Sequence, residues 1–577
     1  MKRLAAVLAS VLALTGCAAI PTRTSAIPVN PSAGSATEAA APKPAKGIDP
    51  LSLVREFVNA SANPEGDYAA AKAYLTEEAR QSWDTKVAPT IIDTTFNTVP
   101  TGGDLSSDDK HRTVLLQGRN VGSLEPDNSF VERVGTLTAP IGIKADQDGE
   151  WRISDPPKGI YVPLVGFQGN YRRVTLYFYN PDFGALVPDP RYVVVPPSTS
   201  IPRRVTELLL KGPGSGLRGA LATAIPNGAA QRKDTHEADD GALEVDLTKV
   251  GDLTAQARKL IVAQVVKSLA GVTSSRIRIL VEGAPISTDQ AEWRPADVQS
   301  GEALITPDAD QSGLVASGGQ VRRLVGGEPV RGPAGTGEYQ VVSAAQSLDG
   351  TELAVVSRVD AKSVRLRVGD LEEPLAAVDL PASTLTRPSW LLSGRAGEPS
   401  TEVWTVVDGA NVVRVVRTDA GWTANVVNAS ELTLFGSITE LRLSRDGTRV
   451  AAVVGGRLVV AAVVRGTDSV SLRLPRNLHP SVLGTSALSV DWLAQDVLVA
   501  STSLAAWPIA KVNIDGLRIE RYNTSNLTVP VNSVSAAPGR NVVAVDQSGL
   551  WSAADVGDVW RASAVKVDST AQAFYPG

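Results

Sequence analysis

The chain has 577 residues, of which 43% are hydrophobic and 20% are charged, and its formal net charge at pH 7 is −5. This mildly acidic balance, without a block of Lys and Arg, argues against nucleic-acid binding through neutralised phosphates. One Met and three His argue against soft-metal or haem chemistry, so no cofactor or metal is expected. The apolar content is ample for packed cores, and the length predicts roughly three domains.

The N-terminus has the order of an export signal. A basic pair follows Met1, and the apolar run Leu4–Leu14 is shorter than the ~20 residues that a membrane-spanning helix needs. The run ends in the letters LTGC at Cys17, the only cysteine of the chain, and this ending resembles the lipobox of bacterial lipoproteins. The resemblance implies that residues 1–16 are removed and that Cys17 carries S-diacylglycerol and N-palmitoyl groups. The alternative is that Cys17 is an ordinary small buried residue.

Residues 17–47 are predicted to form a flexible tether. They are rich in Ala, Pro, Ser and Thr and contain no aromatic residue. Prolines that deny them regular structure stand at Pro21, Pro28, Pro31, Pro42 and Pro44. A flexible coil of this length spans ~30 Å on average and ~100 Å when fully extended. We therefore expect the folded part to stand off the membrane.

In residues 48–165 the spacing of the apolar residues changes from the period of a helix to that of a strand. Apolar residues recur at helical spacing from Leu51, and Asp67 is expected to cap a second helix that ends near Trp83. Alternating strands follow, and Asp148-Gly149 is typical of a hairpin turn. Helices followed by a curved antiparallel sheet resemble the NTF2-like α+β cone.

Some NTF2-like cones hold a small-molecule pocket and a catalytic Asp–His pair. The only His in this part is His111, which follows Asp108 and Asp109 in a polar stretch. We interpret this trio as a solvated loop rather than a site.

Residues 170–285 alternate between strands and helices. The predicted elements are strands at 174–179, 243–247 and 277–281 and helices at 201–210 and 255–269. The phrases VTLYFYN, ELLLKGP, AIPNG and LEVDLT resemble, in this order, the GerMN domain of spore-germination proteins, which implies a noncatalytic binding or assembly module. Residues 214–219 match G-x-G-x-x-G, but they follow a helix rather than a strand, so a turn is expected.

Residues 310–577 contain an internal repeat. The pattern S-x-D-G-T-x-φ-A begins at Ser347 and Ser444, and weaker copies near Trp390, Trp492 and Ala537 complete a series spaced 43 to 54 residues apart. A period of about 40–50 residues with four short strands is typical of a β-propeller blade. Five or six blades are expected, with 313–327 as an outer strand pair that closes the ring with the C-terminus. An open array of β-sandwiches is the alternative.

This C-terminal part shows no catalytic or metal-binding pattern. His479 is its only His. Asp308–Gly313 resembles the first half of a calcium loop, but Gly319 stands where the bidentate Glu belongs, so a linker is expected. Seven of the ten Trp lie after residue 320 and are interpreted as one large filler for each blade.

The order of these parts resembles the LpqB family of actinobacterial lipoproteins. The expected fold is multidomain and mainly β with α+β parts: an NTF2-like domain (48–165), an α/β GerMN domain (170–285) and a five- or six-bladed propeller (310–577). The resemblance implies a noncatalytic accessory lipoprotein, anchored through Cys17 at the extracytoplasmic face of the cell membrane. It further implies binding to the extracellular domain of an MtrB-type sensor histidine kinase and modulation of cell-wall and division signalling. The alternative is an envelope hydrolase or a solute-binding lipoprotein that acts on cell-wall material.

Overall fold

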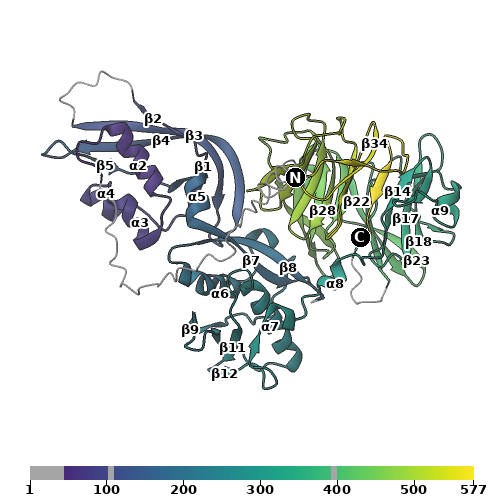
Figure 1. Ribbon diagram of the computed structural model, residues 1–577, viewed down its shortest axis with the longest axis horizontal. Coiled ribbons are helices and arrows are strands. Elements are labelled where there is room, and N and C mark those ends of the chain that lie inside the picture. Colours follow the sequence, from purple (N-terminus) through teal and green to yellow (C-terminus); the bar gives the residue numbers. More distant parts are fainter. Residues whose placement is uncertain (1–43, 102–109, 183, 392–398) are drawn as a thin grey trace, which may run out of the picture. The chain divides into compact units, whose positions relative to one another are not determined.

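The computed structural model describes residues 44–101, 110–182, 184–391 and 399–577 (Figure 1). Within these ranges, no helix is long and apolar enough to cross a membrane. The export signal, Cys17 and nearly all of the tether lie outside the described residues, as do Asp108 and Asp109. Residues 43–577 form one compact unit, and its three successive parts are called here the N-terminal domain, the middle domain and the propeller.

The N-terminal domain packs three helices on one face of a curved sheet (Figure 1). The sheet has the strand order β5-β4-β3-β1-β6, and β2 pairs with β3. The elements are α2 Pro50–Ala60, α3 Glu65–Lys72, α4 Glu77–Ser82, β1 Thr90–Ile92, β2 Asn97–Pro100, β3 His111–Leu124, β4 Phe130–Ala145, β5 Trp151–Asp155 and β6 Tyr161–Pro163. Helix α2 begins where the Asp49 carboxylate accepts bonds from the Leu51 and Ser52 N–H groups at 3.0 and 3.1 Å. Its apolar face is buried and so anchors the helix on the sheet.

The prediction of one continuous second helix that ends near Trp83 is wrong, because this stretch forms two helices, α3 and α4. Asp67 is not an N-cap: its backbone has a φ of 58° inside α3, and its carboxylate accepts bonds from Lys72 and Thr85. The new helix α4 is capped by Thr76, whose hydroxyl accepts from the Ala79 N–H at 3.2 Å. The break lies at residues 73–76, where the backbone turns to β5: the Ile153 N–H donates to the Tyr74 carbonyl and the Thr76 N–H donates to the Ile153 carbonyl, both at 2.9 Å.

The middle domain joins a two-stranded hairpin to a second sheet through two helices. The hairpin is β7-β8, and the sheet has the order β12-β11-β10-β9, with β13 beside β11. The elements are α5 Leu164–Asn170, β7 Tyr171–Tyr179, β8 Leu186–Val194, α6 Ile201–Lys211, β9 Ala230–Glu237, β10 Leu243–Thr248, α7 Ala255–Leu269, β11 Ile277–Val281, β12 Ala284–Pro285 and β13 Glu292–Trp293. The predicted helices and strands of this region are confirmed. Residues 214–219 form a loop with a short 3-10 turn after α6, as the sequence indicates.

The C-terminal part is a six-bladed propeller. Five sheets have four consecutive strands each, and the sixth has the order β15-β14-β36. The strands are β14 Leu314–Ser317, β15 Gln320–Arg323, β16 Val341–Gln346, β17 Glu352–Arg358, β18 Val364–Asp370, β19 Ala376–Ala377, β20 Ser389–Trp390, β21 Glu402–Val407, β22 Asn411–Thr418, β23 Gly421–Val426, β24 Ile438–Leu443, β25 Arg449–Val454, β26 Arg457–Arg465, β27 Val470–Asn477, β28 Ala487–Ala494, β29 Val497–Thr502, β30 Ile509–Asn513, β31 Ile519–Arg521, β32 Ser533–Ser535, β33 Val542–Asp546, β34 Gly549–Ala553, β35 Arg561–Ala562 and β36 Gln572–Phe574.

The ring closes through the strand pair that the sequence indicates. β14 lies antiparallel to β36, with Leu314 opposite Phe574. The inner strands β16, β20, β24, β28, β32 and β36 each contact the next, and β36 contacts β16. The idea of one Trp for each blade is wrong, because the sheet β20–β23 has Trp390, Trp404 and Trp422 while β16–β19 and β24–β27 have none. The strands of the latter two sheets contribute mainly Val, Leu and Ala to the core, and the aromatic rings packed with them, such as Trp404 and Phe574, come from other strands.

Candidate functional site

Charged side chains gather at the axis of the propeller, around which the blades are arranged. They come from the inner strands β24 and β28 and from residues that flank β20 and β24. All are nearly excluded from solvent: Arg387, Glu440, Arg442, Arg445 and Asp491. Three guanidinium groups therefore face two carboxylates in a setting where unpaired charge is strongly disfavoured.

Arg387 ties four inner strands together across the axis. Its guanidinium donates to the Ala573 carbonyl of β36 at 3.0 Å and to Glu440 Oε1 of β24 at 2.6 Å. It also reaches the carbonyls of Val490 in β28 and Val534 in β32 at 3.4 and 3.5 Å. A side chain with this many partners is positioned to hold the blades together.

Arg442 and Arg445 hold the segment that follows β36. Arg442 donates to the Gly577 carbonyl at 3.1 Å. Arg445 donates to the Pro576 carbonyl at 3.2 Å and to the carbonyls of Trp492 and Ala536 at 3.0 and 3.1 Å. Burial lowers the pKa of Arg442 to about 10, so it stays charged at neutral pH. The residues after β36 thus fill the axis at this end.

Asp491 balances part of this positive charge. Its carboxylate accepts bonds from the Ser535 hydroxyl and the Ala536 N–H at 3.0 and 3.1 Å, and it lies 3.5 Å from Arg442 Nε. Burial opposes its ionisation, but the neighbouring guanidinium groups hold the pKa of Asp491 below its usual range. A carboxylate that stays ionised and is bonded on both oxygens is poorly suited to take up a proton as a general base.

The sequence pattern does not reveal this axial cluster. Arg445 occupies a variable position of the S-x-D-G-T repeat, and Asp491 stands within the apolar phrase LSVDWL. A charged residue inside an apolar inner strand is the one signal that could have indicated a buried ionic contact.

The sequence-predicted residues are not brought together into one site. His111 begins β3 and is exposed. Asp308 and Asp310 are exposed, and the carbonyl of Asp308 accepts from Arg540 at 2.6 Å, which fits the linker interpretation. In the described ranges, no group of three or more His, Cys, Asp or Glu residues could hold a metal ion.

His479 lies in a polar contact between the propeller and the N-terminal domain. Its backbone N–H donates to Glu132 Oε2 of β4 at 2.8 Å, and its Nδ1 lies 3.9 Å from Glu132 Oε1. Burial raises the pKa of Glu132 to about 7 and lowers the pKa of His479 to about 4. Because the two residues are 347 positions apart, no sequence motif could have joined them.

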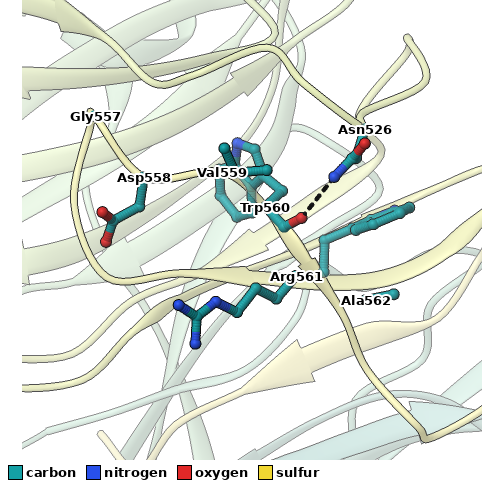
Figure 2. Close-up of a pocket in the computed structure, with 8 residues that line it drawn as sticks. Asn526, Gly557, Asp558, Val559, Trp560, Arg561 and Ala562 are labelled. Carbon is teal, nitrogen blue, oxygen red and sulfur yellow. Dashed lines mark hydrogen bonds between the residues drawn. The ribbon is translucent and has the colours of Figure 1, made fainter. Parts of the chain in front are cut away.

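A shallow, open hollow of about 730 Å³ lies beside β34 and β35. Figure 2 shows Asn526 on one side of the segment 558–562, which ends in β35, while Asp558 and Arg561 point to the other side. Asn526 Nδ2 donates to the Trp560 carbonyl at 3.0 Å. Small-molecule sites present convergent polar groups, and the polar side chains of this hollow diverge.

Comparisons with known proteins cover nearly the whole chain. Residues 43–168 match the family model "Lipoprotein LpqB, N-terminal domain", 175–287 match "Sporulation and spore germination", and 319–576 match "Lipoprotein LpqB beta-propeller domain". The Lipoprotein LpqB of Mycolicibacterium smegmatis is 32% identical and covers 95% of this chain and 95% of its own. That of Mycobacterium tuberculosis is 31% identical and covers 94% and 93%.

Solved structures resemble parts of the chain more distantly. The Cps50 β-propeller domain of Myceliophteria thermophila is 14% identical, covers 42% of this chain and 79% of its own, and has a TM-score of 0.29. A likeness this low says nothing of function. The two LpqB models and the full-length relatives, by contrast, agree on one assignment. The chain therefore belongs to the LpqB lipoprotein family.

Proposed function

We propose that this protein is a noncatalytic accessory lipoprotein that is anchored to the extracytoplasmic face of the cell membrane. Residues 1–16 serve as the export signal, Cys17 receives the acyl chains, and 17–47 form the tether. The folded parts are an NTF2-like domain at 48–165, a GerMN domain at 170–285 and a propeller at 310–577. The partner is the extracellular domain of an MtrB-type sensor histidine kinase, whose signalling state shifts when the lipoprotein binds.

The observation that carries this proposal is the match along almost the entire chain to relatives named Lipoprotein LpqB. The charged groups at the propeller axis are poorly arranged for catalysis. Both carboxylates there, Glu440 and Asp491, are buried and paired with arginines. The axial end next to β36 is filled by Pro576 and Gly577.

A membrane capture experiment tests the proposed partner. The tagged full-length protein is crosslinked in intact cells and isolated from detergent-solubilised membranes, with Cys17→Ser as the matched unanchored control. We expect a sensor kinase with the wild type and much less with Cys17→Ser, because the anchor raises the local concentration at the membrane. Recovery of no membrane kinase with the wild type would refute the partner. Release of soluble fragments from purified cell wall would instead favour an envelope hydrolase.

A further inference from the structure

The N-terminal and middle domains share an apolar core. Tyr171 of β7 and Tyr192 of β8 belong to the middle-domain hairpin, yet both are buried in the cluster of the N-terminal domain. Phe167 stacks on Tyr171 with ring centroids 4.7 Å apart and lies 5.3 Å from the Tyr192 ring. The Tyr192 N–H donates to the Asn128 carbonyl at 2.9 Å, and Asn128 Nδ2 donates to the Tyr192 carbonyl at 3.0 Å. Burial of these aromatic rings strongly opposes separation of the two domains.

The contact of these domains with the propeller has a different character. In the described residues, the apolar cluster of the middle domain contains no propeller side chain. Among the apolar side chains of the described ranges, Leu517 is the one from the propeller that packs against the N-terminal core. The apolar contribution to this contact is therefore small.

Polar groups supply most of the contact instead. Arg173 of β7 donates to Asp515 at 2.9 Å and to Asp496 at 2.8 Å, and the Tyr192 hydroxyl donates to Asp515 at 3.0 Å. Arg449 of β25 donates to the carbonyl of Pro188 in β8. Three further bonds of this polar seam run from Gln495 to the Leu186 carbonyl at 3.0 Å, from the His479 N–H to Glu132 at 2.8 Å and from Arg476 to the Phe130 carbonyl at 3.5 Å.

The covalent connection leaves little chain between the two sides. Glu302 still pairs with Lys267 of α7 at 3.3 Å, which holds it to the middle domain. From Asp308 onward the chain is held by the propeller, because Arg540 donates to the carbonyls of Asp308 and Ala309 at 2.6 and 2.9 Å. The crossing therefore lies within residues 303–307.

We propose that the molecule consists of two bodies, the fused N-terminal and middle domains and the propeller, held together by the polar seam as a releasable latch that pivots at residues 303–307. Interfaces between domains stay closed without motion mainly when they are large and hydrophobic. Charge-assisted bonds, in contrast, weaken when salt screens them or when another polar surface competes. Arg173 and Asp496 are 28% and 20% exposed, so water and ions reach this part of the seam.

Distances between pairs of spin labels test the latch in the full-length chain. Cys17→Ser removes the only native thiol, and cysteines are introduced at the exposed positions Thr138, Lys259 and Asp419. The Thr138–Lys259 pair measures the fused body, and the Thr138–Asp419 pair measures the fused body against the propeller. The measurement uses no partner protein, so its outcome does not depend on the proposed kinase.

Arg173→Ala combined with Arg449→Ala removes the two charged donors of the latch that bond at 2.9 Å or less, and leaves only the longer bond of Arg476 to the Phe130 carbonyl. We expect the closed-to-open ratio to fall roughly ten- to a hundredfold, as for the loss of charged hydrogen bonds. This gives a second, longer Thr138–Asp419 population, while the Thr138–Lys259 distance stays single. Arg278→Ala is the matched control, since its ion pairs lie within the middle domain, and it should leave both distances unchanged.

The unsubstituted seam provides a second measurement that does not depend on how the variant folds. At about 1 M salt, where the Debye length is roughly 3 Å, the open population of the label pair across the seam should rise. A single narrow Thr138–Asp419 distance in both the double variant and high salt would overturn the latch. Equal broadening of the Thr138–Lys259 distance would overturn the fused body.

Discussion

Replacing Asp491 by Asn tests whether the axial charge cluster stabilises the propeller. The substitution keeps the shape and part of the hydrogen bonding to Ser535 and Ala536 but removes the negative charge that faces Arg387 and Arg442. Within the cluster, the carboxylate of Glu440 would then be the one negative charge left to balance three guanidinium groups. Loss of one partner from a buried ionic contact costs about 3–5 kcal/mol.

This loss is large enough to measure by calorimetry of the full chain. A domain of this size shifts its Tm by roughly 2–4 °C per kcal/mol, so the propeller transition should fall by roughly 6–20 °C. Asp555→Asn, an exposed substitution in the same propeller, is the control and should shift it little. A decrease of less than roughly 2 °C for Asp491→Asn would refute the view that this carboxylate balances the axial arginines.

The pH dependence of the same variant gives an independent check. Because the pKa of Asp491 is held below its ordinary value of 3.8, its contribution to stability is complete above pH 3.8 and is lost as the pH falls through the lower folded-state pKa. The gap in Tm between the wild type and Asp491→Asn should therefore stay constant above about pH 4 and narrow in more acidic buffer. A gap that widens on acidification would contradict the sign of this shift.

Three further predictions concern other parts of the molecule. Cys17→Ser should release the protein from membranes during a high-salt wash, because each buried CH₂ of an acyl chain contributes ~0.8 kcal/mol; retention would argue against lipidation. Gly122→Ala should lower stability by about 1–3 kcal/mol, since its Cβ would lie 2.3 Å from a buried phenylalanine ring, whereas Gly135→Ala meets no atom within 4 Å and should be nearly neutral. Glu132→Gln and His479→Gln should change the pH dependence of the Tm in opposite directions. The first variant retains His479, whose pKa is lowered from 6.5 to about 4 by folding, so its stability decreases as the pH falls from 6.5 to 4. The second retains Glu132, whose pKa is raised from 4.5 to about 7 by folding, so its stability decreases as the pH rises from 4.5 to 7. If the Tm of both variants changed with pH in the same direction, burial would not be the cause of the two pKa shifts.

Local patterns predicted the regular elements of the chain well. The helix expected at 255–269 has the same bounds in the structure, and the Asp-Gly turns after Ser347 and Ser444 each join the first two strands of a blade. These features depend on periodicity and turn chemistry, which act within a few residues. The break before α4 was not predicted, because it depends on backbone bonds from Tyr74 and Thr76 to Ile153 of β5, which lies far away in the sequence.

Contacts between distant residues could not be derived in this way. Glu352 and Arg449 occupy the same position in the two best copies of the repeat. Glu352 forms an ion pair with Arg417 of the next blade, whereas Arg449 reaches out of the ring to the carbonyl of Pro188. The repeat pattern marks this position as variable, but only the three-dimensional arrangement shows that one copy joins blades and the other joins domains.

The pairing of β36 with β14 has a consequence for how the propeller folds. Each of the other five sheets is built from neighbouring strands, so it can form soon after its own residues are available. The sixth sheet places Leu314 opposite Phe574, and contacts between residues so far apart in sequence form slowly. Until they form, the first and fifth sheets of the series lack a neighbour and expose apolar surface and strand edges. The interval before ring closure is therefore the stage at which the chain is most vulnerable to proteolysis and aggregation.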